Sequence, residues 1–328
     1  MSIAARLSWG LRVIGLACTA LLPFTVQAQA FPDRAVTLVV AYGAGSPADI
    51  TARALADDLA VVLKQPVIVE NRVGGNQIVA ASSIARAPAN GYSIFLAVLP
   101  SVTAPSLQAT LPYKAMADFA PIAKVSTILG MLGIAPDVPA NNLKEFIELL
   151  RANPGKYSYG SSGIGSAMHL FTEKFNADIG AKSIHVPYRS VQPVLTDLMG
   201  NRVSYSFMPA SFMEFAKAGK IKALGFSGLK GDPDHPTLPT IDAAGLKGFE
   251  AVISYVVVTT KGTPPAVIAR LNGAINTVTA TPAFAKKVMP LGGVQVGPPM
   301  TPAETGELIA KEEARWNALV KTQNIPLE

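Results

Sequence analysis

Cysteine is almost missing from this chain, which has Cys18 as its single cysteine in 328 residues. That position lies in an N-terminal segment that we expect to be cleaved, so the mature chain would contain none. Disulfides, thiolate catalysis and cysteine-ligated metals are therefore excluded. Histidine is also scarce, and His169, His185 and His235 lack the spacing of a metal-binding motif. We predict no metal site and no cofactor.

Hydrophobic runs long enough to cross a membrane are missing as well. Val13–Phe24 is an apolar stretch of about 12 residues, whereas a spanning helix needs roughly 20. Two arginines precede this stretch, and small-x-small sites follow it at Ala28 and Ala30, as in a secretory signal peptide. We expect residues 1–30 to be a signal peptide cut after Ala28 or Ala30, and the product to be periplasmic.

Charge of one sign is only mildly in excess. The formal net charge is +6 at pH 7, and Lys286-Lys287 is the one adjacent basic pair after the N-terminal segment. No basic block alternates with aromatic residues, which argues against nucleic-acid binding. A small basic excess is compatible with anionic ligands but does not establish one.

Short β-branched runs alternate with helical patterns in the rest of the chain, which indicates an α/β architecture with mainly parallel sheets. We expect strands such as Val36–Tyr42 and Tyr92–Val98. Expected helices include Pro47–Leu63, Ser166–Asp178 and Val191–Met199.

The order of these elements predicts two lobes. Residues 31–131 and 251–328 would form lobe 1, and residues 132–250 would form lobe 2. Two crossing segments, Ile128–Ala135 and Ala251–Thr260, would make a two-strand hinge that lets the lobes close around a ligand.

The first candidate site is the loop that follows the expected strand Val36–Tyr42. Glycine, serine and the start of a helix follow one another there, so backbone N–H groups can point outward and bind a carboxylate. The alternative is a tight turn with Ser46 as helix cap and Pro47 at the first helical position. The third glycine of a dinucleotide fingerprint is missing, and no P-loop lysine follows. The candidate residues are Tyr42, Gly43, Ala44, Gly45, Ser46, Ala48 and Asp49.

A second loop of the same design lies about 120 residues later, at Ser161–Ser166. Its candidate residues are Ser161, Ser162, Gly165 and Ser166. We expect His169, one turn into the following helix, to have a structural role. Tyr188 and Arg189, which end another expected strand, would provide a phenol donor and a cation for an acidic ligand. Their alternative is a packed tyrosine and a solvated arginine.

Catalysis has little support in the sequence. A G-x-S-x-G elbow fails at Ile164, which stands where the last glycine would be. No nucleophile and base are identifiable as a pair, so we predict no catalytic residues. The competing hypothesis is a periplasmic hydrolase or isomerase that uses Ser162, Ser166 or His169.

Several segments, in this order and spacing, carry a family resemblance: FPDRAVTLVVAYGAGSPADITAR, QPVIVENRVGGN, ARAPANGYSIFLA, DFAPIAKV, YGSSGIGSAMHLFTEKF, HVPYRS with DLMGNRVSYSF, and GTPPAVIARLN. Together they resemble the periplasmic solute-binding receptors of the tripartite tricarboxylate transporter family, the Bug receptors. The resemblance covers essentially the whole mature chain. It implies a Venus-flytrap fold of two α/β lobes that closes on a small carboxylated solute.

The resemblance also implies a set of binding residues and partners. The two loops Tyr42–Asp49 and Ser161–Ser166 would grip a ligand carboxylate, and Ser101, Tyr188 and Arg189 would complete the pocket. The partners would be a small organic anion and the large and small subunits of a membrane permease, with the receptor itself a monomer. A sensory role with a membrane sensor kinase is the alternative.

Some residues depart from the common family pattern. Ala44 stands where glycine is usual, Ala48 where threonine is frequent, and Ser190 where glycine is common. Tyr255-Val256 replaces tryptophan and a small residue. These changes leave the identity of the carboxylate open.

Overall fold

Three parallel strands form the first part of the sheet. The computed structural model describes residues 31–100 and 111–325, so the expected signal peptide and Ser101 lie outside the described residues. β1 (Val36–Val40) pairs in parallel with β2 (Val67–Asn71) on one side and β3 (Ser93–Leu99) on the other. α1 (Pro47–Leu63) connects β1 to β2, and a 3-10 turn (Gly75–Gln77) and α2 (Ile78–Ala85) connect β2 to β3.

A second group of parallel strands lies in the middle of the chain. β5 (Ser158–Ser161) pairs in parallel with β6 (Ile184–Pro187) and β7 (Tyr205–Pro209). The elements around them are α3 (Leu143–Ala152), α4 (Ala167–Ile179), α5 (Val191–Met199), a 3-10 turn (Ala210–Phe212), α6 (Met213–Lys217) and β8 (Lys222–Phe226).

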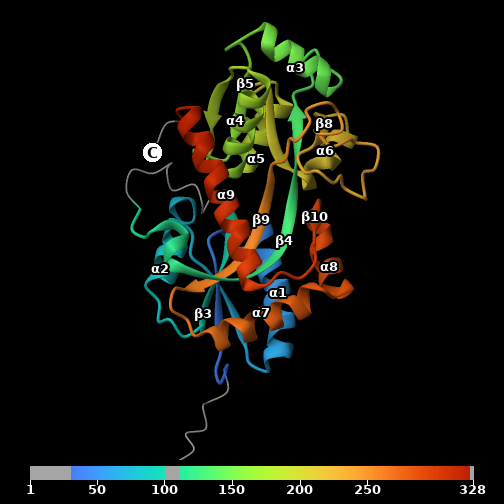
Figure 1. Ribbon diagram of the computed structural model, residues 1–328. Coiled ribbons are helices and arrows are strands. Elements are labelled where there is room, and N and C mark those ends of the chain that lie inside the picture. The colour runs from blue at the N-terminus through green and yellow to red at the C-terminus, as the bar shows by residue number, and fades with distance from the viewer. Residues whose placement is uncertain (1–30, 101–110, 326–328) are drawn as a thin grey trace, which may run out of the picture. The chain divides into compact units, whose positions relative to one another are not determined.

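Two long strands join these groups (Figure 1). β4 (Phe119–Ile134), which follows a 3-10 turn (Ala115–Asp118), runs antiparallel to β9 (Val252–Thr260) along most of its length. Its far end pairs with β7 and β8 instead, so β4 belongs to both groups. β9 also pairs antiparallel with β3. The strand order among the described residues is β2-β1-β3-β9-β4-β7-β5-β6, with β8 and β10 (Val294–Gln295) on β4.

The last helices pack on these strands. They are α7 (Pro265–Thr279), α8 (Pro282–Val288), a 3-10 turn (Met289–Leu291) and α9 (Pro302–Thr322). α9 starts at a capping box, in which Thr301 and Glu304 satisfy each other's backbone amides. Along α9, Ile309 packs in the core around β3, whereas Trp316 and Val320 pack in the core around β7.

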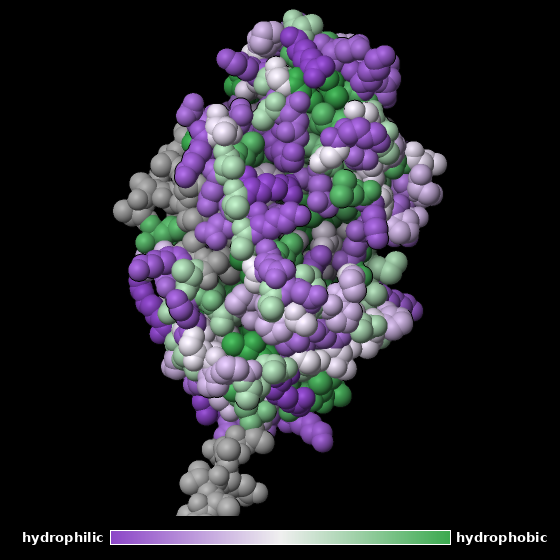
Figure 2. All heavy atoms as spheres, in the orientation of Figure 1, coloured by the Kyte–Doolittle hydropathy of each residue, from purple (hydrophilic) through white to green (hydrophobic). Residues whose placement is uncertain are grey.

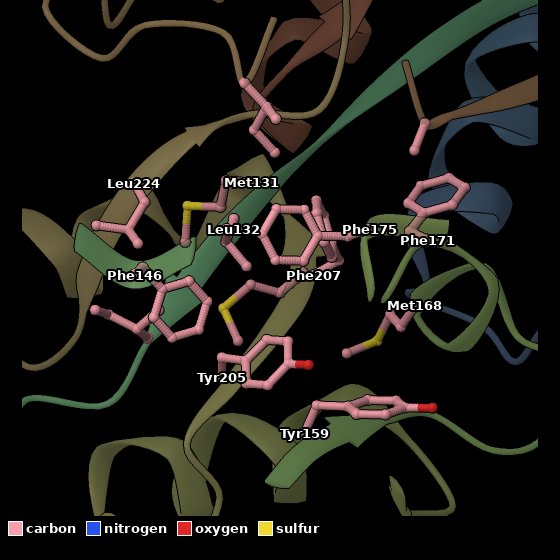
Figure 3. Close-up of a cluster of buried hydrophobic side chains, with 14 of the residues drawn as sticks. Met131, Leu132, Phe146, Tyr159, Met168, Phe171, Phe175, Tyr205, Phe207 and Leu224 are labelled. Atoms are coloured by element: carbon pink, nitrogen blue, oxygen red, sulfur yellow. The ribbon is translucent and has the colours of Figure 1, made fainter. Parts of the chain in front are cut away.

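Separate hydrophobic cores support the two groups of strands. Alternate residues of β1 face opposite sides, so Leu38 joins the core under α1 and α7 while Val39 joins the core under α2. A third core surrounds β7 and includes Phe146 and Phe207 (Figure 3). We propose that these cores belong to two lobes, lobe 1 (31–131 and 251–328) and lobe 2 (132–250). α9 contacts the cores of both.

The surface drawn in Figure 2 is mostly hydrophilic, with hydrophobic residues in scattered patches. In the described part of the chain, no helix combines the length and the apolar character that crossing a membrane requires. The same residues contain no group of three or more His, Cys, Asp or Glu side chains that could hold a metal ion.

Candidate functional site

A cavity of about 360 Å³ lies where strands from both groups meet the first residues of α1, α4 and α5. Ligand pockets usually have volumes of about 300–1,000 Å³, so this cavity is of suitable size for a small ligand. The residues predicted from the sequence that line it are Tyr42, Gly45, Ser46, Ala48, Ser162, Ser166 and Arg189. The structure therefore brings the two loops and the Arg189 segment to one place.

The first loop is shaped by hydrogen bonds to its own helix. The Ser46 amide donates to the Gly43 carbonyl at 3.2 Å, and Ser46 Oγ accepts from the Asp49 amide at 3.3 Å. Gly45 has a φ of +80°, which glycine adopts without steric cost, and its amide donates to Asp49 Oδ2 at 2.9 Å. Ser46 is thus a helix cap, as the alternative interpretation expected, and it also lines the cavity.

The second loop repeats this pattern bond for bond. The Ser166 amide donates to the Gly163 carbonyl at 3.2 Å, and Ser166 Oγ accepts from the His169 amide at 3.3 Å. Gly165 has a φ of +75°, and its amide donates to His169 Nδ1 at 3.1 Å. His169 therefore takes the position that Asp49 has in the first loop.

Several amides of the helix starts remain available to a ligand. Pro47 has no N–H, and the next amide, that of Ala48, has no hydrogen-bond partner among the described residues. The amides of Ala167 and Met168 at the start of α4 also lack a partner in this part of the chain. Such amides carry the partial positive charge of a helix N-terminus.

Asp49 holds the first loop in place from behind. Asp49 is 2% exposed and does not line the cavity. Arg53 donates to both carboxylate oxygens at 3.0 and 2.9 Å, and Asn71 donates to Oδ1 at 2.8 Å and also to the Tyr42 carbonyl. Burial alone would raise the pKa of Asp49, but these hydrogen bonds outweigh it and hold the pKa below its usual value. Gly43 and Ala44 are exposed and lie outside the lining.

Ser161 and His185 support the second loop in a similar way. Ser161 Oγ lies 2.7 Å from His185 Nε2, 3.1 Å from the Gly163 carbonyl and 3.2 Å from the Gly163 amide. One arrangement satisfies all three contacts: the imidazole and the amide donate to Oγ, and the hydroxyl donates to the carbonyl. His185 then has no lone pair directed at Ser161. Since Ser161 is also 0% exposed, this serine–histidine contact has the features of a structural bond rather than of a nucleophile with its base.

Buried His169 and half-buried His185 stack behind the loop. The rings of His169 and His185 lie 4.1 Å apart, and Tyr159 stacks on His185 at 4.7 Å. Burial lowers the pKa of His169 to about 3, with a further contribution from His185, and burial lowers the pKa of His185 to about 4. Both imidazoles are therefore neutral at pH 7.

Tyr188 and Arg189 have different surroundings. The Tyr188 hydroxyl donates to Asp197 Oδ2 at 2.6 Å, and Tyr188 does not line the cavity. Burial, followed by the Asp197 contact, raises the pKa of Tyr188 to about 12. Arg189 is exposed, lines the cavity, and has no ion pair or hydrogen bond among the described residues. Next to it, the side chain of Ser190 makes no cap hydrogen bond to α5.

Apolar side chains that were not predicted as site residues make most of the remaining wall. Met168 and Phe171 come from α4 and Phe207 from β7, and Figure 3 shows them beside the aromatic core. Their helical or alternating spacing is the same as that of ordinary core residues. Tyr255 of β9 also lines the cavity; it was noted in the sequence as a departure from the family pattern but was not predicted as a site residue.

A family model described as the tripartite tricarboxylate transporter family receptor matches residues 51–325. The chain belongs to this receptor family. It is 31% identical to protein BugT of Bordetella pertussis, over 97% of this chain and 98% of BugT. A structure of the periplasmic binding protein BugD has a TM-score of 0.77 and 32% identity, over 91% of this chain and all of BugD (100%). Rpa4515 of R. palustris, solved with adipate, has a TM-score of 0.79 and 29% identity, over 91% of this chain and 100% of Rpa4515.

These findings confirm the family resemblance and the two-lobe α/β fold of periplasmic binding proteins. The family is described as a receptor family, and BugD is described as a periplasmic binding protein. One structural neighbour binds a carboxylate, adipate.

Proposed function

We propose that this family member is a periplasmic receptor that captures a small carboxylated solute between its two lobes. It would deliver the solute to a membrane permease made of one large and one small subunit. Residues 1–30 direct export, and the mature protein acts as a monomer that binds its ligand without chemistry of its own. The observation that carries the proposal is the convergence of three helix starts and Arg189 on one cavity.

This convergence suits an anion for electrostatic reasons. Each helix start contributes roughly half an elementary positive charge, concentrated on its unpaired amides. At the start of α5, Ser190 provides no side-chain cap, and the amides of Val191 and Gln192 have no partner among the described residues. Arg189 adds a full charge and a planar set of donors suited to a carboxylate.

Both proposed lobes contribute to the same anion. Ser46 and Ala48 come from lobe 1, whereas Ser162, Ser166 and Arg189 come from lobe 2. A carboxylate bound to both would favour the closed arrangement, with the long strands β4 and β9 as the hinge. The adipate bound to Rpa4515 supports a carboxylate as the ligand class.

The test is calorimetric titration of the mature protein with a broad panel of carboxylates, using Arg189→Ala and a control variant. Arg86→Ala is a matched control, because Arg86 is also exposed and does not line the cavity. Losing a charge-assisted hydrogen bond should weaken carboxylate binding by about tenfold to a hundredfold in Arg189→Ala only. Recovery of the ligand unchanged after long incubation would separate binding from turnover. No binding to any carboxylate, or equal losses in both variants, would contradict the proposal.

A further inference from the structure

Charged side chains are nearly missing from the cavity. Among the described residues that line it, Arg189 is the only Lys, Arg, His, Asp or Glu. Asp49 lies behind the first loop and is already bound by Arg53 and Asn71. Arg189 is therefore the one full charge among these lining residues, the helix starts add partial positive charge, and no other charged side chain is available to pair with a second carboxylate.

Beside the amides and hydroxyls of the helix starts, much of the cavity wall consists of apolar, adaptable side chains. Two methionines, Met168 and Met208, and two phenylalanines, Phe171 and Phe207, contribute to this part of the wall. Methionine fits irregular shapes and makes favourable contacts with aromatic rings. A second carboxylate placed against such walls would lose its hydration without gaining a charge partner, which is strongly unfavourable.

Tyr255 places one polar group in this apolar region. Its side chain is 4% exposed and lines the cavity from the middle of β9, opposite Val98 of β3. Its hydroxyl makes no hydrogen bond to another described residue, so it is available to a ligand in the cavity. Burial raises the pKa of Tyr255, so the hydroxyl stays protonated and can donate. A ligand with an uncharged oxygen at this point would satisfy it.

We propose that the solute is a monocarboxylate with an apolar body that carries an uncharged oxygen, which accepts a hydrogen bond from Tyr255. This inference rests on the proposed function and narrows it. The carboxylate lies at the helix starts and Arg189, the body fills the space between Met168 and Phe171, and the oxygen lies at Tyr255. Tyr255 is then a specificity-determining residue.

The experiment compares two matched sets of acids by titration calorimetry. One set has a chain body: hexanoate, 6-hydroxyhexanoate and adipate. The other has a ring body: benzoate, 4-hydroxybenzoate and terephthalate. Each set is titrated into the wild-type mature protein, into Tyr255→Phe and into Tyr92→Phe. Tyr92 is a matched control, because its hydroxyl bonds to Asp33 and it does not line the cavity.

In the set whose body fits, we expect the hydroxy acid to bind most tightly and the diacid to bind at least about tenfold more weakly. Tyr255→Phe should weaken the hydroxy acid by about threefold to tenfold and leave the parent acid within about twofold. Tyr92→Phe should change neither. A melting temperature near that of the wild type would show that both variants fold.

Other outcomes separate the two proposals. A diacid that binds as tightly as the hydroxy acid would overturn this inference while leaving the proposed function intact. Equal effects of Tyr255→Phe on all three acids would overturn the role of Tyr255. No binding by any of the six acids would also overturn the inference, and no binding across the broader carboxylate panel would overturn the proposed function itself.

Discussion

The stacked histidines behind the second loop should make folding stability depend strongly on pH. In the folded protein the pKa of His169 is about 3 and that of His185 about 4, whereas an unfolded histidine has a pKa of about 6.5. The unfolded chain therefore binds protons that the folded chain excludes. The contribution of the two neutral histidines to the free energy of unfolding is fully present above pH 6.5. It is lost as the pH falls from 6.5 toward 4.

The size of this effect follows from the two pKa differences. Between pH 4 and 6.5 each histidine gives a slope of about 1.4 kcal/mol per pH unit. Going from pH 7.5 to pH 5 should remove about 3–4 kcal/mol from the free energy of unfolding. That is a large share of the roughly 5–15 kcal/mol typical of a folded domain.

Urea unfolding at several pH values, with a designed double variant, measures this contribution. In His169→Asn the amide oxygen replaces Nδ1 as acceptor for Gly165, and in His185→Gln the amide nitrogen replaces Nε2 as donor to Ser161. The double variant should lose most of the slope between pH 5 and 6.5. Glu173 acts in the opposite sense, since burial raises its pKa, but it is common to both proteins and cancels in the comparison. An unchanged slope would refute the assignment of neutral imidazoles to His169 and His185.

Three further predictions concern the first loop and the cavity wall. Trp316 is the one tryptophan in residues 31–328, and it stacks at 5.6 Å on Phe171, which lines the cavity. Ligand binding should therefore change tryptophan fluorescence, and a change of equal size in Phe171→Leu would show that this contact does not transmit it. Asp49→Ala should lower the free energy of unfolding by about 1–3 kcal/mol in urea, against less than about 0.5 kcal/mol for the exposed Asp57→Ala. Gly45→Ala should cost about 1 kcal/mol, because its φ is +80° although no atom lies near its missing Cβ. No loss of melting temperature in that variant would contradict the left-handed conformation.

The positions of both loops could be predicted from the sequence because local chemistry determines them. A β-branched run, a short glycine and serine segment and a helical pattern follow one another twice, and the structure has α1 and α4 starting at Pro47 and Ala167. Helix caps and left-handed glycines act over a few residues, so they are visible in a linear sequence.

The cavity walls could not be predicted in the same way. Met168, Phe171 and Phe207 follow the periodicity of core residues, and only the tertiary packing decides that one side of each faces a cavity. Tyr188 shows the reverse case. Its phenol looked available to a ligand in the sequence, but Asp197, nine residues later on α5, accepts its hydrogen bond in the structure.

Asp49 in the first loop and His169 in the second loop have equivalent positions but different charges. This difference explains how both loops avoid repelling an anion. Each residue accepts a hydrogen bond from the loop glycine four positions earlier. In the first loop the acceptor is a carboxylate, whose charge is balanced by Arg53 beside it. In the second loop the surroundings are Tyr159 and His185, with no cation among the contacts described, and an unbalanced carboxylate buried there would be costly. A neutral imidazole makes the same hydrogen bond without adding negative charge next to the proposed carboxylate site.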